Sequence, residues 1–331
     1  MNDSNENVVN DTIVKEQNNE VDLSVNLMGV KLKNPVIAAS GTFGNSSEYS
    51  DFFDVSLLGG LCTKGLTIVP RAGNKGVRVW ETPSGLLNSI GLENIGIVDF
   101  IEKDLPNMKK LGPAIIANLS GGESDEYVKG AVLLNESSVD IIELNISCPN
   151  VKVGGMAFGL DPGTAAALVS AVRRVCRDKP LMVKLSPNAP SLSAVALACV
   201  NAGADALSLV NTFKAMAIDI INRKPVFENT TAGLSGPAIK PIALRMVWEL
   251  FETLKDSNIQ VPIVGLGGIS CTNDALEFLM AGACAIQVGS ATFANPLTMI
   301  EIIDGLKQYM TANKLNSLSD ISIRGLYGKD Y

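Results

Sequence analysis

The sequence contains no histidine among its 331 residues. Catalytic triads that depend on histidine, zincin-type zinc sites and histidine metal clusters are therefore excluded. If the protein is an enzyme that moves protons, it must use Cys, Lys, Asp, Glu or Tyr, or leave the difficult step to a cofactor.

Three other features that the sequence lacks exclude further classes of protein. No run approaches the ~18 consecutive apolar residues of a membrane span, and no basic segment precedes an apolar core as in a signal peptide, so we expect a cytoplasmic protein without membrane contact. The six cysteines include no CxxC pair, which argues against a bound metal or iron–sulfur cluster. A net charge of −7 without clustered Lys and Arg argues against nucleic-acid binding.

The chain divides at about residue 20. Residues 1–20 are rich in Asn and carboxylates and hold too little apolar surface to order themselves, so we expect a disordered N-terminal tail. Residues 21–331 are predicted to form a single domain, because the 47% hydrophobic composition can fill a large aliphatic core.

Alternating apolar and polar residues from Val21 predict a β-hairpin that could cap the floor of a barrel. Beyond it, eight short apolar runs are bounded by Gly, Pro, Ser or Asn and are predicted to be strands: Pro35–Ala39, Gly60–Lys64, Ala114–Leu119, Ile141–Ile146, Leu181–Leu185, Ala206–Val210, Pro262–Leu266 and Ala285–Val288. Helical patterns lie between most of them, for example from the N-cap Ser191 to Gly203, and from Asp274 to Met280. Eight such units favour a closed (β/α)₈ TIM barrel over an open doubly wound sheet.

Two features place an active site at the C-terminal face of this barrel. The longest intervals, residues 67–110 and 212–258, are predicted to be inserted βα loops bordering the site. Polar residues also stand at or just after the strand ends: Ser40, Lys64, Asn118, Asn145, Cys148, Lys184 and Asn211. One such residue could be a satisfied core group, but seven in register indicate a polar ligand.

The last two strands end in glycine turns, Gly265–Ile269 and Gly289–Thr292. Backbone N–H groups at such turns are typical of barrels that bind a phosphate group.

Cys148 stands between Asn145 and Asn150, before a glycine-rich loop that could close over a substrate. Cys148 suits proton exchange with a ligand, although a lone cysteine can also be a small buried hydrophobe, as we expect for the other five.

These segments together resemble the dihydroorotate dehydrogenase family from Val21 to about Leu306. The most specific matches are Ala38–Thr42, Thr63–Gly65, Asn88–Leu92, Asn145–Asn150, Gly267–Gly268 and Val288–Ser290. The resemblance implies an FMN-binding catalytic barrel, with no metal and with these cofactor contacts: Ser40, Lys64, Gly65, Asn118, Asn145, Lys184, Val210, Gly236, Gly267, Gly268, Gly289 and Ser290. Lys184 would stabilise the anion that flavin reduction creates.

The resemblance also implies the reaction, the oxidation of (S)-dihydroorotate to orotate in pyrimidine biosynthesis. Cys148 would act as the general base at C5 while hydride leaves C6 for the flavin. The implied substrate contacts are Lys64, Asn88, Ser89, Ile90, Gly91, Leu92, Asn145, Asn150, Asn211 and Thr212.

Within the family, Cys148 and the following loop resemble class 1B enzymes, which are homodimers that join a second subunit in a heterotetramer. That partner carries FAD and a [2Fe–2S] cluster and passes electrons to NAD⁺. This chain has neither a cysteine cluster nor a G-x-G-x-x-G motif, so a route to NAD⁺ would need such a partner. The alternatives are a fumarate-dependent class 1A enzyme, a dihydropyrimidine dehydrogenase-like subunit, and a barrel that binds a phosphorylated ligand without catalysis.

Overall fold

The computed structural model describes residues 21–44, 47–147 and 158–321. Within these ranges, eight parallel strands close into a barrel in which neighbours in space follow one another along the chain. The barrel strands are β3 (Val36–Ala38), β4 (Gly60–Cys62), β7 (Ala114–Leu119), β8 (Ile141–Asn145), β9 (Leu181–Lys184), β10 (Ala206–Leu209), β15 (Ile263–Leu266) and β16 (Ala285–Val288). Each lies inside one of the predicted apolar runs, so the predicted (β/α)₈ barrel is confirmed.

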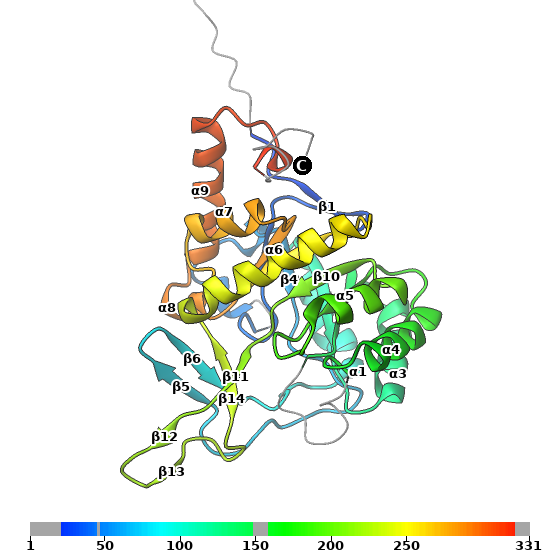
Figure 1. Ribbon diagram of the computed structural model, residues 1–331, viewed down its shortest axis with the longest axis vertical. Helices are drawn as coiled ribbons and strands as arrows, with labels where there is room; N and C mark the ends of the chain where they lie inside the picture. Colours follow the sequence, from blue (N-terminus) through cyan, green and yellow to red (C-terminus); the bar gives the residue numbers. More distant parts are fainter. Residues whose placement is uncertain (1–20, 45–46, 148–157, 322–331) are drawn as a thin grey trace, which may run out of the picture.

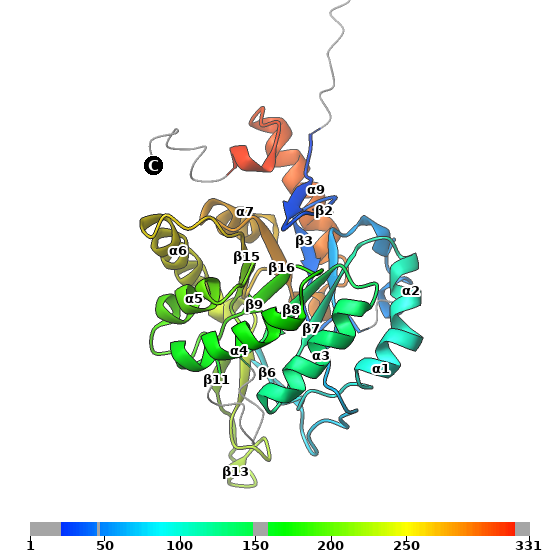
Figure 2. The same ribbon diagram turned by 90° about the vertical axis from the view of Figure 1, so that its right-hand side faces the viewer.

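Helices surround the barrel (Figures 1 and 2). They are α1 (Ile97–Asp99), the π-helical turn η3 (Phe100–Asp104), α2 (Leu105–Lys110), α3 (Ser124–Glu136), α4 (Pro162–Val175), α5 (Leu192–Asn201), α6 (Lys240–Asp256), α7 (Thr272–Met280), α8 (Ala291–Ala294) and α9 (Thr298–Ala312). None of the helices in the described ranges combines the length and apolarity needed to cross a membrane.

The predicted ends of α5 and α7 are confirmed. Ser191 Oγ accepts a hydrogen bond from Ala194 N at 3.3 Å and caps α5. Gly203 and Gly282 follow α5 and α7 with φ of 107° and 106°, the left-handed region that favours glycine at helix ends. The two helix-to-strand junctions, Ala202-Gly203-Ala204 and Ala281-Gly282-Ala283, therefore end their helices in the same way.

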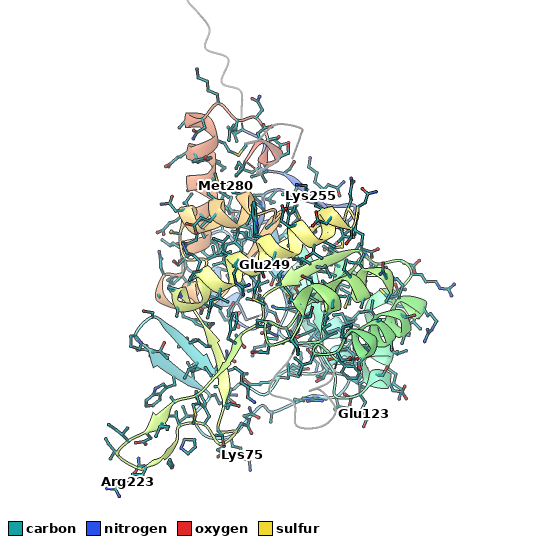
Figure 3. The ribbon with its side chains drawn as sticks, viewed as in Figure 1. Lys75, Glu123, Arg223, Glu249, Lys255 and Met280 are labelled. Carbon is teal, nitrogen blue, oxygen red and sulfur yellow. The ribbon has the colours of Figure 1, made fainter. Side chains whose placement is uncertain are left out.

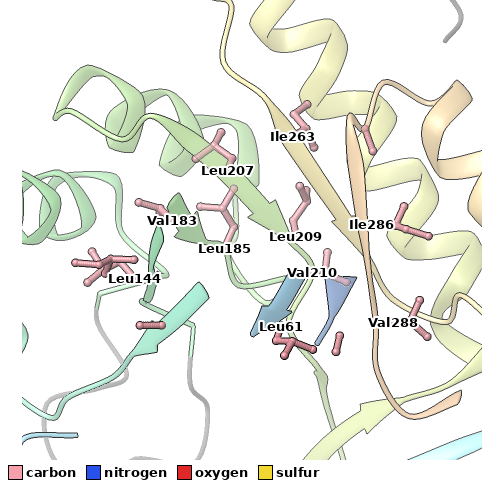
Figure 4. Close-up of a cluster of buried hydrophobic side chains, with 14 of the residues drawn as sticks. Leu61, Leu144, Val183, Leu185, Leu207, Leu209, Val210, Ile263, Ile286 and Val288 are labelled. Carbon is pink, nitrogen blue, oxygen red and sulfur yellow. The ribbon is translucent and has the colours of Figure 1, made fainter. Parts of the chain in front are cut away.

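Two apolar regions hold the barrel together. The larger lies between the strands and the helices, and Figure 4 shows part of it, including Leu61, Leu144, Val183, Leu207 and Ile286. The smaller lies inside the barrel at its amino-terminal end, where the hairpin of β1 (Val25–Leu27) and β2 (Val30–Leu32) contributes Val25, Leu27 and Leu32. The predicted hairpin floor is therefore confirmed.

The two inserted segments build a second sheet at the opposite end of the barrel from this hairpin (Figure 1). Strands β5 (Val79–Thr82) and β6 (Gly85–Asn88) pair with β11 (Phe213–Ala215) and β14 (Ala232–Ser235) in the order β11–β14–β6–β5. The inserted βα segments predicted over residues 67–110 and 212–258 are therefore confirmed, and besides this sheet they include α1, α2 and α6.

A further hairpin, β12 (Ile218–Asp219) and β13 (Lys224–Pro225), projects from this second sheet, with the exposed Arg223 at its far end (Figure 3). Short 3₁₀ turns complete the described chain: η1 (Ser47–Tyr49), η2 (Val55–Leu57), η4 (Pro237–Ile239) and η5 (Leu318–Asp320).

Candidate active site

Side chains that point into the barrel form layers. On each strand, the side chains of successive layers are two residues apart. The lowest layer is apolar and receives one buried side chain from every barrel strand: Ile37, Cys62, Ile116, Ile141, Met182, Ala206, Val264 and Ala285. Because side chains two apart along a strand share a face, the next layer consists of Ala39, Lys64, Asn118, Glu143, Lys184, Ser208, Leu266 and Gln287. The interior therefore changes from apolar to mainly polar within one layer, toward the carboxyl ends of the strands.

The centre of the polar layer is Glu143, whose side chain is fully buried. Its Oε1 accepts hydrogen bonds from Ser208 Oγ and Gln287 Nε2, both at 2.8 Å. Its Oε2 accepts from Asn118 Nδ2 at 2.5 Å and from Cys62 Sγ at 3.3 Å. Four donors from four other strands thus meet one carboxylate, which uses about all of its acceptor capacity.

Lys184 is the cation nearest to this carboxylate. Its Nζ lies 3.9 Å from Glu143 Oε2, and its side chain is 6% exposed. Burial by itself raises the pKa of the Glu143 carboxyl, but the charge of Lys184 and the accepted hydrogen bonds outweigh burial and lower that pKa. Glu143 is therefore ionised at neutral pH.

Within the described part of the chain, no hydrogen-bond acceptor lies beside the ammonium of Lys184. Its distance to Glu143 exceeds that of a hydrogen bond, and no other partner of Nζ occurs in the described ranges. A buried ammonium without acceptors is unfavourable. Lys184 therefore presents a charge and free donors at the level where the barrel opens.

A chain of amides runs from Glu143 to the barrel mouth. A carboxylate only accepts, so Asn118 turns its Nδ2 toward Glu143, and Asn118 Oδ1 accepts from Asn145 Nδ2 at 3.2 Å. Asn145 Oδ1 in turn accepts from Ser147 Oγ at 3.0 Å. Asn211 Nδ2 donates to Ser147 Oγ at 2.7 Å. The buried carboxylate thus determines which way these amides face.

The loop of residues 88–92 is held in place from several sides. Asn88 Nδ2 donates to Gly233 O at 3.2 Å, which ties the two inserted segments together. Asn74 Nδ2 donates to Ser89 Oγ at 3.0 Å, and Ser89 is 2% exposed. A Cβ at Gly91, where φ is 78°, would lie 2.6 Å from the backbone N of Asn74, so this close approach requires glycine. The loop is therefore a defined element of the site.

Lys64 lies at the rim of the polar layer and is partly exposed. Its Nζ is 4.0 Å from Glu93 Oε2, an oxygen that also accepts from Arg78 Nη1 at 3.0 Å. Lys64 and Glu93 both line a cavity of about 270 Å³. Because such an exposed and long pair contributes little stability, Lys64 can turn toward a ligand at low cost.

The glycine turn after β15 packs directly on the segment after β14. Gly267 and Gly268 have φ of 130° and 76°. A Cβ at Gly268 would lie 2.8 Å from both Gly236 O and Lys240 N, which are backbone atoms. The structure therefore brings together three of the glycines predicted to contact the cofactor. Gly289 and Ser290 follow β16 and lead into α8.

The remaining predicted residues fall into three groups. Ser40, Gly65, Val210, Asn211 and Thr212 follow barrel strands at their carboxyl ends. Gly236 and residues 88–92 come instead from the inserted segments. Cys148 and Asn150 lie outside the described residues, so the predicted general base stays a prediction.

The central carboxylate Glu143 and its partners Ser208 and Gln287 are not among the site residues predicted from the sequence. Ser120 is not among them either, and its buried Oγ, like Gln287 Oε1, has no hydrogen-bond partner in the described ranges. Spacing was the available signal, because Glu143 and Gln287 each stand two positions after a residue of the apolar layer.

The fold and the site define a (β/α)₈-barrel protein with a layer of polar side chains toward the carboxyl ends of its strands. The sequence model of dihydroorotate dehydrogenase matches residues 22–310, and the chain belongs to this family.

Several relatives of the chain share one name. The dihydroorotate dehydrogenase B (NAD(+)) catalytic subunit of Petrotoga mobilis is 54% identical over 301 residues, which cover 91% of this chain and 98% of that protein. Proteins of the same name from Geotalea daltonii and a Thermoanaerobacter species are 49% and 48% identical, covering 91% of this chain and 97% and 98% of their own lengths.

Proposed function

We propose that this protein oxidises (S)-dihydroorotate to orotate, in pyrimidine biosynthesis, with FMN as the hydride acceptor. The observation that carries the proposal is the buried Lys184 ammonium, which has no acceptor within hydrogen-bond distance in the described ranges and stands in the polar layer at the barrel mouth. The names of the relatives, dihydroorotate dehydrogenase B (NAD(+)) catalytic subunit, support the same reaction.

The residues present fit a flavin. The free donors of Lys184 suit the polar pyrimidine side of the ring, and the unpaired Ser120 Oγ offers a further polar group. A Cβ at Gly65 would lie 2.8 Å from Leu92 Cδ2 and 3.2 Å from Ser120 Oγ, so glycine keeps this part of the mouth open. The proposed FMN contacts are those predicted from the sequence: Ser40, Lys64, Gly65, Asn118, Asn145, Lys184, Val210, Gly236, Gly267, Gly268, Gly289 and Ser290. When bound, FMN supplies the acceptor for the hydride.

The fixed amides suit a cyclic diamide substrate, which offers both donors and acceptors. Asn145 and Asn211 are oriented by the hydrogen bonds of the amide chain, and the loop at residues 88–92 is held by Asn74. We propose that these residues, with Lys64, Asn150 and Thr212, bind dihydroorotate and that Cys148 removes the proton from C5. Pre-set amide orientations lower the cost of ordering the site on binding.

The electron acceptor and assembly are also part of the proposal. The names of the relatives favour NAD⁺ and an additional subunit. We propose a homodimer joined to a partner with FAD and a [2Fe–2S] cluster, acting in the cytoplasm, with residues 21–331 as one catalytic domain. A fumarate-dependent enzyme is the competing possibility.

One anaerobic spectrum tests the core of the proposal. The purified chain should show flavin absorbance, and dihydroorotate added without oxygen should bleach it. Absorbance should return with NAD⁺ only when the partner subunit is present, whereas recovery with fumarate alone would indicate the competing acceptor. A yellow protein that dihydroorotate does not bleach would refute the substrate, and a protein that cannot be reconstituted with FMN would refute the cofactor.

A further inference from the structure

Glu143 is a buried charge that the proposed reaction does not use directly. All of its hydrogen-bond partners in the described ranges are side chains of the barrel interior, at 2.5 to 3.3 Å. Its acceptor capacity is thus filled, and its pKa is lowered, so it is a poor base for a ligand proton. An ionised carboxylate kept at the centre of a barrel needs another explanation, since burying a charge is costly.

The explanation that the geometry supports is electrostatic. Glu143 Oε2 is 3.9 Å from Lys184 Nζ, close enough to compensate part of its charge but too far to occupy its donors. A ligand beside Lys184 therefore meets free N–H donors together with a reduced net positive charge. Loss of Glu143 would leave the donors in place and expose the full charge of Lys184.

We infer that Glu143 is a positioning residue that sets the net charge which the barrel interior would present to the flavin, and so limits how strongly the site favours reduced, anionic flavin. This inference rests on the proposed FMN site. Without Glu143, the uncompensated ammonium would stabilise negative charge on the flavin, which would then accept electrons more readily and pass them on less readily. The amide chain through Asn118 provides a second effect of the same carboxylate on the orientation of the site.

Sulfite affinity provides a readout independent of turnover. Sulfite adds reversibly to N5 of oxidised flavin, leaves negative charge on the ring and bleaches its visible absorbance. We expect Glu143→Gln loaded with FMN to bind sulfite about tenfold more tightly than wild type, since it removes the carboxylate 3.9 Å from Lys184 Nζ and a neighbouring charge changes such equilibria by roughly tenfold or more. The flavin reduction potential should rise in the same variant.

Ser208→Ala is the matched control. It removes one hydrogen bond to Glu143 Oε1 and keeps the carboxylate, so its sulfite affinity should stay close to that of wild type. An equal gain in Ser208→Ala and Glu143→Gln would point to altered packing and would overturn the inference.

A second pair of variants applies if Glu143→Gln does not fold. Lys184→Met keeps the carboxylate alone, whereas Glu143→Leu with Lys184→Met replaces both charges by apolar side chains, a change that buried ion pairs often tolerate. The double variant should bind sulfite more tightly than Lys184→Met, because only the single variant holds an uncompensated negative charge.

The outcomes separate this inference from the proposed function. A wild-type protein that binds no FMN overturns both. Wild type that binds FMN and is bleached by dihydroorotate, with the same sulfite affinity as Glu143→Gln, overturns the inference alone. Equal affinities for Lys184→Met and the double variant also overturn it.

Discussion

Replacing Gly268 with alanine tests whether the turn after β15 depends on direct backbone contact. The new Cβ would lie 2.8 Å from Gly236 O and from Lys240 N, and φ at this position is 76°. A residue with a Cβ in this region of φ costs ~1–2 kcal/mol. Overpacking against atoms that cannot rotate away costs a further ~1–3 kcal/mol. Together, Gly268→Ala should lower the free energy of unfolding by ~2–5 kcal/mol.

Gly29→Ala is the matched control because its φ is 85° and no atom lies within 4 Å of the added Cβ. It should show the φ cost alone. An unfolding entropy of ~2.1 cal/mol/K per residue gives ~0.7 kcal/mol/K for this chain, so the apoprotein Tm should fall by ~3–7 °C in Gly268→Ala and by ~1–3 °C in Gly29→Ala.

The same two variants test the cofactor site. After gel filtration, Gly29→Ala should keep FMN, whereas Gly268→Ala should lose most of it, because the displaced turn belongs to the proposed phosphate contacts. Equal Tm values and equal FMN content in the two variants would refute the reasoning from close contact.

Three further predictions concern ionisable groups. Cys148→Ala should still bind FMN and orotate but oxidise dihydroorotate far more slowly, and unchanged turnover at neutral pH would remove its role as base. The lowered pKa of Glu143 contributes stability above the ordinary value of 4.5 that is lost as pH falls through the folded value, so urea titrations below pH 4.5 should show a smaller loss in Glu143→Gln than in wild type. Burial raises the pKa of Cys199 to about 12, so iodoacetamide at neutral pH should leave Cys199 unmodified in the native protein while it labels the exposed Cys271; early labelling of Cys199 would contradict this burial.

The barrel could be predicted because each strand carries its own signal. β7 and β16 are short, mostly apolar runs, each with one polar residue (Asn118 and Gln287) and with turn residues on both sides, and their predicted limits match the observed ones. A strand that is buried on both faces can be predicted from its own residues, because an apolar run indicates that both faces are covered. Parallel strands alternating with helices then leave little choice of topology.

The second sheet could not be predicted in the same way. β5 reads Val-Trp-Glu-Thr and is largely exposed, so it has no apolar face to mark it as a strand. β6 pairs with β14 through Asn88 and Gly233, residues from different inserted segments. The pairing of β6 with β14 forms only after the barrel has brought the two inserted segments together. The hydrophobicity of either segment alone therefore does not predict it.

In the site, too, the spacing of residues along a strand predicts some features, whereas others arise only when the barrel closes. Polar residues at strand ends were found because Lys184 and Asn118 interrupt apolar runs, and the two-residue period would also have placed Glu143 on the interior face. Its partners are a different matter. The bond from Gln287 to Glu143 joins β16 to β8, which are not neighbours in the barrel, so it exists only when the sheet has closed around the interior. The bond from Ser208 on β10 likewise crosses the interior, so two of the hydrogen bonds that lower the pKa of Glu143 depend on the completed barrel, whereas Lys184 on the neighbouring β9 does not.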